Sequence, residues 1–159
     1  MNQIRTVFGV FFLSLAALYS CSTKEREFTT VDELMDIILE EEDLASYPRL
    51  SIDGYDINYE ILRGKLTLTK KDIGFYELKE GELRIITKLP EFTEEEFVEV
   101  DAKLDGKSIN YNQYRRFELD KIYKKVQLDQ KTNDSISGVN QHIIWLYTKD
   151  YLQSQNNQS

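Results

Sequence analysis

The chain has 159 residues, of which 41% are hydrophobic and 30% charged, with only two prolines and seven glycines. This composition predicts one or two small folded domains rather than a disordered chain. The formal net charge of -8 at pH 7 would repel phosphate backbones, which argues against a nucleic-acid partner.

The N-terminal segment has the features of an export signal. A single positive charge at Arg5 is followed by a nearly unbroken apolar run from Val7 to Leu18. This run is too short to cross a bilayer, because a membrane-spanning helix needs about 20 apolar residues. We therefore expect residues 1–20 to form a signal peptide that is removed from the mature protein.

The signal ends in "LYSC", which resembles the lipobox of bacterial lipoproteins. In that family the cysteine thiol receives a diacylglycerol group and becomes the new N-terminus, so the resemblance implies a lipid anchor on Cys21. Tyr19 departs from the small or β-branched residue that is usual at its position. The alternative is an ordinary signal peptide with an accidental cysteine. Cys21 is the only cysteine of the chain, which excludes an intramolecular disulfide.

A tether and a helix are predicted next. Residues 21–29 are polar and lack periodicity, which is typical of a flexible tether. Residues 30–46 are predicted to form an amphipathic helix, with Thr30 and Glu33 as a capping box. The acids of residues 40–43 at its end could attract a cation, but a solvated helix end is the alternative.

The first of two similar units is predicted over residues 47–90. Leu50 and Ile52 alternate with polar neighbours as in a half-buried strand, and Asp53-Gly54 ends that strand. A short helix over 57–63 and two further strands, 73–78 and 83–87, around a turn at Gly81 complete the unit.

The second unit is predicted over residues 91–149 and repeats this order. A strand over 98–104 ends in Asp105-Gly106, and a loop between Asp129 and Gln141 is longer than its counterpart. We expect Ile52 and Leu104 to be buried at equivalent positions, and Ile57 and Ile109 to begin equivalent helices. Chance similarity is the alternative. Residues 150–159 are predicted to be a polar tail.

The repeated order resembles the plug module of TonB-dependent outer-membrane receptors, and especially the short plug-like units of Bacteroidota envelope proteins. The first unit carries "SIDG", "KKDIGFYELK" and "LRIITK", and the second "KLDGK", "LDKIYKKVQL" and "HIIWLYTK". The resemblance implies an α+β fold, with an N-terminal helix followed by two tandem strand-helix-strand-strand modules. It also implies an envelope setting, and it carries no catalytic residue.

Few residues point to catalysis or cofactor chemistry. His142 is the only histidine and lies in an apolar strand, so neither a metal site nor a histidine-based triad is predicted. No glycine-rich phosphate loop occurs, and no cofactor is expected. Paired carboxylates among residues 94–96, Asp101 and Asp105 are the remaining enzymatic option, as in a glycosidase.

Tyrosines offer candidate contact residues. Tyr55, Tyr59, Tyr111 and Tyr114 follow the two Asp-Gly turns and could form matched contact patches, although Tyr59 and Tyr111 could instead close the cores of their units. The "DSI" at 134–136 resembles the acceptor of Bacteroidota O-glycosylation, which implies a sugar on Ser135, with an unmodified loop as the alternative.

The sequence therefore predicts a lipid-anchored envelope protein that acts as a protein-interaction module at the outer membrane. Its expected partners are the membrane, through the lipid anchor, and another envelope protein. An acidic lipoprotein that binds a small ligand or glycan is the first alternative, and a hydrolase with paired carboxylates is the second. The sequence leaves open whether the protein faces the periplasm or the cell surface.

Overall fold

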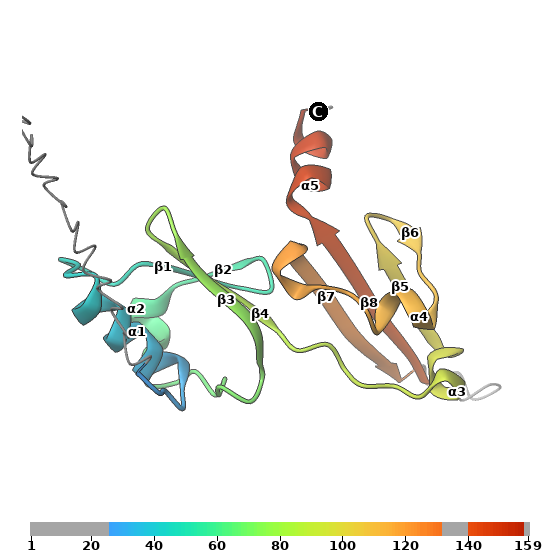
Figure 1. Ribbon diagram of the computed structural model, residues 1–159, viewed down its shortest axis with the longest axis horizontal. Helices are drawn as coiled ribbons and strands as arrows, with labels where there is room; N and C mark the ends of the chain where they lie inside the picture. The colour runs from blue at the N-terminus through green and yellow to red at the C-terminus, as the bar shows by residue number, and fades with distance from the viewer. Residues whose placement is uncertain (1–25, 132–139, 158–159) are drawn as a thin grey trace, which may run out of the picture.

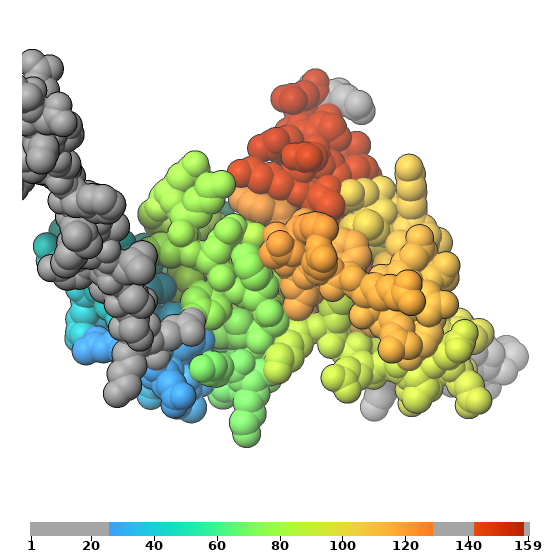
Figure 2. Space-filling model, viewed as in Figure 1, coloured from blue at the N-terminus to red at the C-terminus, as the bar shows by residue number. Residues whose placement is uncertain are grey.

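The structure is a computed structural model that describes residues 26–131 and 140–157. Figure 1 shows two small modules, each built on its own four-stranded sheet, with a helix extending from the end of the second sheet. Helices and strands are interspersed along the chain, which confirms the predicted α+β class. Figure 2 shows the two modules in contact, with the C-terminal helix projecting from the second.

The first module contains α1 (Val31–Glu41), β1 (Arg49–Ile52), β2 (Tyr55–Ile57), α2 (Tyr59–Leu62), β3 (Ile73–Lys79) and β4 (Glu82–Thr87). Its strands lie in the order β2-β1-β4-β3. β1 is parallel to β4 and antiparallel to β2, and β3 and β4 form a hairpin. Glu80 and Gly81 both have positive φ at the tip of this hairpin, as a two-residue turn with the twist of the strands requires.

The second module contains α3 (Glu94–Phe97), β5 (Val100–Leu104), β6 (Lys107–Ser108), α4 (Tyr111–Tyr114), the 3-10 turn η1 (Leu119–Lys121), β7 (Ile122–Lys131), β8 (Asn140–Thr148) and α5 (Lys149–Asn156). Its strand order, β6-β5-β8-β7, and its strand directions repeat those of the first module. β3 and β7 also shift register at equivalent points, after Ile73 and after Ile122. The predicted repeat of strand order is therefore present, including the direction of the last strand.

The aspartate of each Asp-Gly turn is bonded to the threonine that ends the neighbouring parallel strand. Asp53 accepts hydrogen bonds from the backbone N–H of Thr87 at 2.8 Å and from its hydroxyl at 2.7 Å. Asp105 accepts the same two bonds from Thr148, both at 2.8 Å. The turn after the first strand is thereby fixed to the end of the last strand. We call each of these pairs an Asp–Thr clamp, and the two clamps explain why the chain repeats these residues.

Two asparagines set the start of the short helices. The side-chain oxygens of Asn58 and Asn110 accept hydrogen bonds from backbone N–H groups inside α2 and α4, as N-cap residues do. The prediction that Ile57 and Ile109 begin these helices is wrong. Ile57 ends β2 and Ile109 follows β6, because each Asp-Gly turn folds the chain back into a short extra strand before the helix.

The first core lies between α1 and one face of the first sheet. The predicted apolar stripe of the helix is buried, and it packs against β1, β3 and β4; the buried residues are Val31, Leu34, Met35, Ile38, Leu50, Ile73, Leu83 and Ile85. The helix ends at Glu41, short of the predicted residue 46.

A further repeated sequence lies before the first strand of each module. The letters "EFT" occur at 27–29 and again at 91–93. A helix capped by a threonine follows each of them, with Thr30 before α1 and Thr93 before α3. α1 has 11 residues, however, and α3 only 4. The second module therefore lacks about two turns of covering helix.

The second core includes residues from both modules. Phe97 of α3, Tyr114 of α4 and the inner residues of β7 and β8 surround it. Ile86 of β4, which belongs to the first module, is fully buried in the same cluster, and Phe75 of β3 packs against it. The first module thus supplies part of the second core.

Ile52 and Leu104 occupy equivalent positions, opposite Ile85 and Leu146. Their equivalence is as predicted, but both are only half-buried at the edge of the cores, so the predicted burial is wrong. Each is the last residue of its strand.

Two segments differ from their predicted structure. β5 begins at Val100 rather than Val98, because Val98 follows α3 directly and is 85% exposed. Most of the predicted polar tail, residues 150–159, forms α5, which is capped by Thr148.

Candidate interaction surfaces

The junction between the modules buries the ammonium group of Lys125. This residue of β7 is 3% exposed, and its ammonium donates hydrogen bonds to the carbonyls of Thr87 (3.2 Å) and Lys88 (3.1 Å) and to the Thr87 hydroxyl. It also forms an ion pair with Asp53 at 3.6 Å. Burial lowers the pKa of Lys125, and the nearby Asp53 carboxylate opposes this effect. Lys125 of the second module therefore contacts both residues of the first Asp–Thr clamp.

Arg84 crosses the junction in the opposite direction. This residue of β4 is 8% exposed, and its guanidinium donates to the carbonyl of Ile122 and to Glu77, at 3.0 and 2.8 Å. The guanidinium also lies over the rings of Phe75 and Tyr123, 5.1 and 5.6 Å from their centroids. The outer face of the first sheet is therefore covered by the start of β7.

The equivalent face of the second sheet has no such cover among the described residues. Trp145 occupies the position of Arg84, and Lys103, Val126, Leu128 and Tyr147 surround it on β5, β7 and β8. None of these side chains belongs to either core. Leu128 is 50% exposed and the other four are half-buried, whereas Ile143, beside Leu128 on the same face, is only 9% exposed. We call these five residues the open sheet surface.

Polar contacts hold Trp145 in place on this surface. Its indole N–H donates to Asp101 at 3.0 Å, and the ammonium of Lys103 lies 5.0 Å from the ring centroid. Lys103 and Asp101 also form an ion pair at 3.3 Å. At one end, Tyr147 stacks on Tyr151 of α5. These contacts fix the orientation of the Trp145 and Tyr147 rings on the surface.

The four predicted contact tyrosines do not form matched patches. Tyr59 and Tyr114 are buried in the two cores, at 5% and 4% exposure. Tyr55 is 48% exposed and lies under the ammonium of Lys124, whereas Tyr111 is half-buried. Only Tyr55 and Tyr111 are left with substantial access to solvent.

The two buried tyrosines differ in their hydroxyl contacts. The Tyr114 hydroxyl donates to the carbonyl of Pro90 at 2.8 Å, and burial raises its pKa. The Tyr59 hydroxyl has no hydrogen bond of acceptable geometry in the described structure, and burial, followed by the nearby Asp32 carboxylate, raises its pKa. Both residues serve the cores of their modules.

The candidate catalytic carboxylates hold local structure. Asp101 accepts from Trp145, Asp105 from Thr148, and Glu96 from the backbone and hydroxyl of Thr93. The bonds from Thr93 lower the pKa of Glu96. His142 is half-buried, with its ring 5.4 Å from that of Phe92. Within 26–131 and 140–157, no three His, Cys, Asp or Glu side chains are grouped as metal ligands would be.

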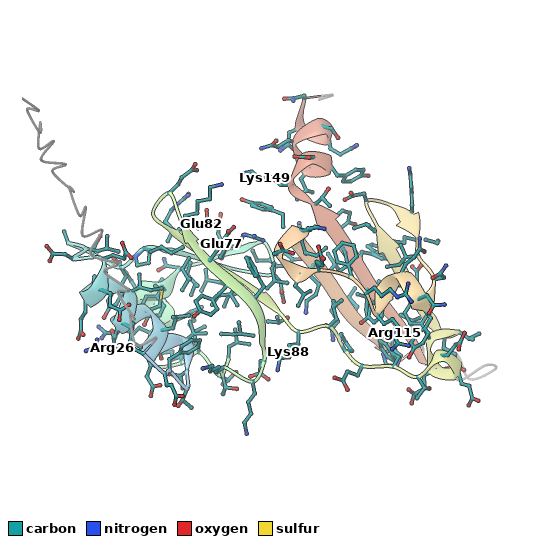
Figure 3. All side chains as sticks on the ribbon, in the orientation of Figure 1. Arg26, Glu77, Glu82, Lys88, Arg115 and Lys149 are labelled. Atoms are coloured by element: carbon teal, nitrogen blue, oxygen red, sulfur yellow. The ribbon has the colours of Figure 1, made fainter. Side chains whose placement is uncertain are left out.

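A cleft of about 440 Å³ opens on the other side of the second sheet, beside α4. One wall is formed by residues 89–92, which lie in the linker between the modules, and the other by Tyr111, Arg115, Phe117 and Leu119. The linker wall also includes Glu91. We call this space the Arg115 cleft, and Figure 3 shows Arg115 beside α4, on the side along which the linker runs.

Two predicted sites, Cys21 and Ser135, lie outside the described residues. Of the helices that the structure describes, none combines the length and the apolar character needed to cross a membrane.

The open sheet surface and the junction were not anticipated from sequence. The sequence signal for the surface is the apolar run "HIIWLY". A strand with apolar residues on both faces is typical of a sheet that packs against other structure on both sides. Lys125 lies in a strand with several charged residues, where no local pattern marks it, whereas Arg84 is a single cation within the apolar run of β4. Comparison of the chain with protein-family models, with curated proteins and with solved structures finds no match.

Proposed function

We propose that this chain is a lipid-anchored cell-envelope protein that acts as a protein-interaction module at the outer membrane. The export signal and the lipobox-like "LYSC" support the anchor at Cys21. The resemblance of both modules to receptor plug units favours a partner in the outer membrane.

One observation carries the interaction role: on the first sheet this face is covered by the second module, whereas on the second sheet no described module covers the equivalent face and Leu128 is 50% exposed. In the first module this face is covered by a neighbouring module, which inserts carbonyl groups and a strand end against Arg84. The second module presents Trp145 and Leu128 at the same place. Tryptophan is enriched at the energetic centres of protein interfaces, because its large rigid ring buries much surface at low entropic cost. A protein partner is therefore the occupant that this face fits best.

The experiment is site-specific photo-crosslinking in intact envelopes. A benzophenone amino acid replaces Leu128, and the matched control carries it at Ile61, an aliphatic residue of α2 that is 62% exposed. We expect a discrete adduct of protein size from position 128 only. We also expect Cys21→Ala to prevent acylation, as the intact mass of the mature chain would show, and to weaken that adduct.

The other outcomes separate the alternatives. Equal labelling from both positions, or none from position 128, would count against an interaction through this surface. Recovery of the protein alone with a bound carbohydrate or small molecule would favour the ligand-binding alternative. Of the carboxylates considered for a hydrolase, Asp101, Asp105 and Glu96 accept internal hydrogen bonds, while Glu94 and Glu95 are exposed. Hydrolysis of a glycoside substrate by the mature chain would favour that alternative.

A further inference from the structure

The Arg115 cleft lies on the opposite side of the second sheet from the open sheet surface. Its significance follows from a comparison of the two modules at equivalent residues. Arg63 ends α2 and Arg115 ends α4, and each donates its backbone N–H to the tyrosine carbonyl four residues earlier. The two arginines therefore leave the helix at the same point, and their surroundings can be compared directly.

In the first module, α1 supplies the groups that surround Arg63. The guanidinium pairs with Asp36 of α1 at 3.2 Å and lies 4.9 Å from the ring centroid of Tyr47. Asp32, one turn earlier in α1, accepts the backbone N–H of Gly64 at 3.0 Å. The apolar face of α1 fills the space beneath these contacts.

In the second module, α3 is too short to supply such a carboxylate and apolar cover. α3 ends at Phe97, after four residues, so no later turn reaches α4. Arg115 lies over the ring of Tyr111, 5.7 Å from its centroid, and no described carboxylate forms an ion pair with it. Glu91, on the opposite wall of the cleft, makes no ion pair with it either.

The cleft thus has a defined chemistry. Its lining combines apolar and aromatic side chains, among them the half-buried Phe117, Leu119 and Tyr111, with polar groups that include the Arg115 guanidinium and Glu91. Arg116, the next residue, is also exposed but does not line the cleft. Apolar rings beside the Arg115 guanidinium are complementary to a segment that carries an apolar side chain next to a carboxylate.

We propose that the Arg115 cleft binds an acidic amphipathic segment of a partner protein, which places an apolar side chain between the linker and Phe117 and a carboxylate on Arg115. The partner segment would give the second module an apolar cover and a carboxylate for Arg115, as α1 gives an apolar cover and Asp36 to the first module. This site goes beyond the interaction role of the open sheet surface and occupies the other side of the sheet.

The test uses a fluorescent peptide of residues 28–44, the sequence of α1 with its flanks, as a model acidic amphipathic segment. Binding to the full mature chain is followed by fluorescence anisotropy. We expect saturable binding that Arg115→Glu weakens about tenfold or more, because a charge-assisted pair is lost and a repulsion added. The matched control is Arg116→Glu, which makes the same charge change next to the cleft and should weaken binding only slightly.

Two further variants separate specific binding from general attraction. Phe117→Ala should weaken binding without changing the charge, and a peptide with Asp36 replaced by Lys should bind Arg115→Glu better than wild type. Because the Arg115 side chain is exposed, Arg115→Glu should fold like the wild type. Urea midpoints of all variants check this. Absence of saturable binding, or equal weakening by the two charge reversals, would overturn the proposal. The Leu128 adduct should be unaffected by Arg115→Glu, so the two proposals can fail separately.

Discussion

Lys125 is the residue on which the junction between the modules most directly depends. A buried ammonium group is costly unless it is paired and hydrogen-bonded. Here the carbonyls of Thr87 and Lys88 and the carboxylate of Asp53 together meet that requirement. All three acceptors lie at the end of the first sheet, so the ammonium fixes the start of β7 to one point.

Burial of Lys125 predicts a pH dependence of stability. Its folded pKa lies below the ordinary 10.5, so between these two values the unfolded chain binds more protons at this site than the folded chain. The free energy of unfolding should therefore rise with pH across this interval and show no slope from this group below it. Lys125→Met should remove the slope, and at pH 7 should destabilise the protein by about 1–3 kcal/mol because buried acceptors lose their donor.

Urea unfolding of both proteins between pH 7 and pH 10 would measure this effect. The upper limit matters because Tyr59 and Tyr114, whose pKa values are raised, lower the stability of the folded state above the ordinary tyrosine value of 10. An identical slope in wild type and variant would show that Lys125 is not responsible.

At the scale of elements, sequence patterns identified what has a clear period or a strong stop signal. β3 and β4 were found as two short runs on either side of the turn at Gly81, and α1 by its apolar stripe. β2 and β6 have only three and two residues, too few to show a period. α5 was missed because its sequence is polar and its start depends on Thr148, which also belongs to the second clamp. The lengths of α1 and α3 depend on tertiary packing rather than on local pattern.

The two Asp-Gly turns allow a matched test of the junction. Gly54 and Gly106 have nearly the same φ, +82° and +78°, so alanine should cost about 1–2 kcal/mol of backbone strain at either position. A Cβ at Gly54 would also lie 2.7 Å from the Lys124 Cβ and from the Tyr123 carbonyl oxygen, whereas at Gly106 its nearest neighbour is the Tyr151 hydroxyl at 3.4 Å.

Gly54→Ala should therefore lower the free energy of unfolding more than Gly106→Ala, by about a further 1–3 kcal/mol, because β7 must move away from the turn. Urea midpoints of the two variants measure the difference. Equal losses would mean that β7 does not approach the first turn as closely as the structure has it.

At the scale of the whole molecule, the surfaces that carry the proposals depend on how the modules meet, which no local sequence pattern reports. The repeat itself was readable, because the Asp–Thr clamps require particular residues at fixed places. The second module covers the first sheet but leaves its own equivalent face uncovered. This arrangement depends on contacts of Arg84 and Ile86 across the junction. The role proposed for Trp145 depends on that asymmetry, and the role proposed for Arg115 on the difference in length between α1 and α3.

The shared core predicts that the two modules unfold together. Ile86 of the first module is fully buried in the second core, and Arg84 donates across the junction, so neither module buries its apolar surface alone. Trp145 is the only tryptophan and reports on the second module, whereas far-UV circular dichroism reports on both. In the mature wild-type chain the two signals should change at the same urea concentration, as in a two-state transition.

Weakening the junction should separate these two signals. In the double variant Arg84→Ala/Ile86→Ala the second module loses its shared core residue, and its short α3 offers less cover than α1 gives the first. Truncating a buried isoleucine costs about 2–5 kcal/mol, so the tryptophan midpoint should fall further than the dichroism midpoint. Ile61→Ala, at an exposed site in α2, is the control and should leave the signals coincident. Separate midpoints already in the wild type would instead show that the modules are stable independently and that the junction contributes little.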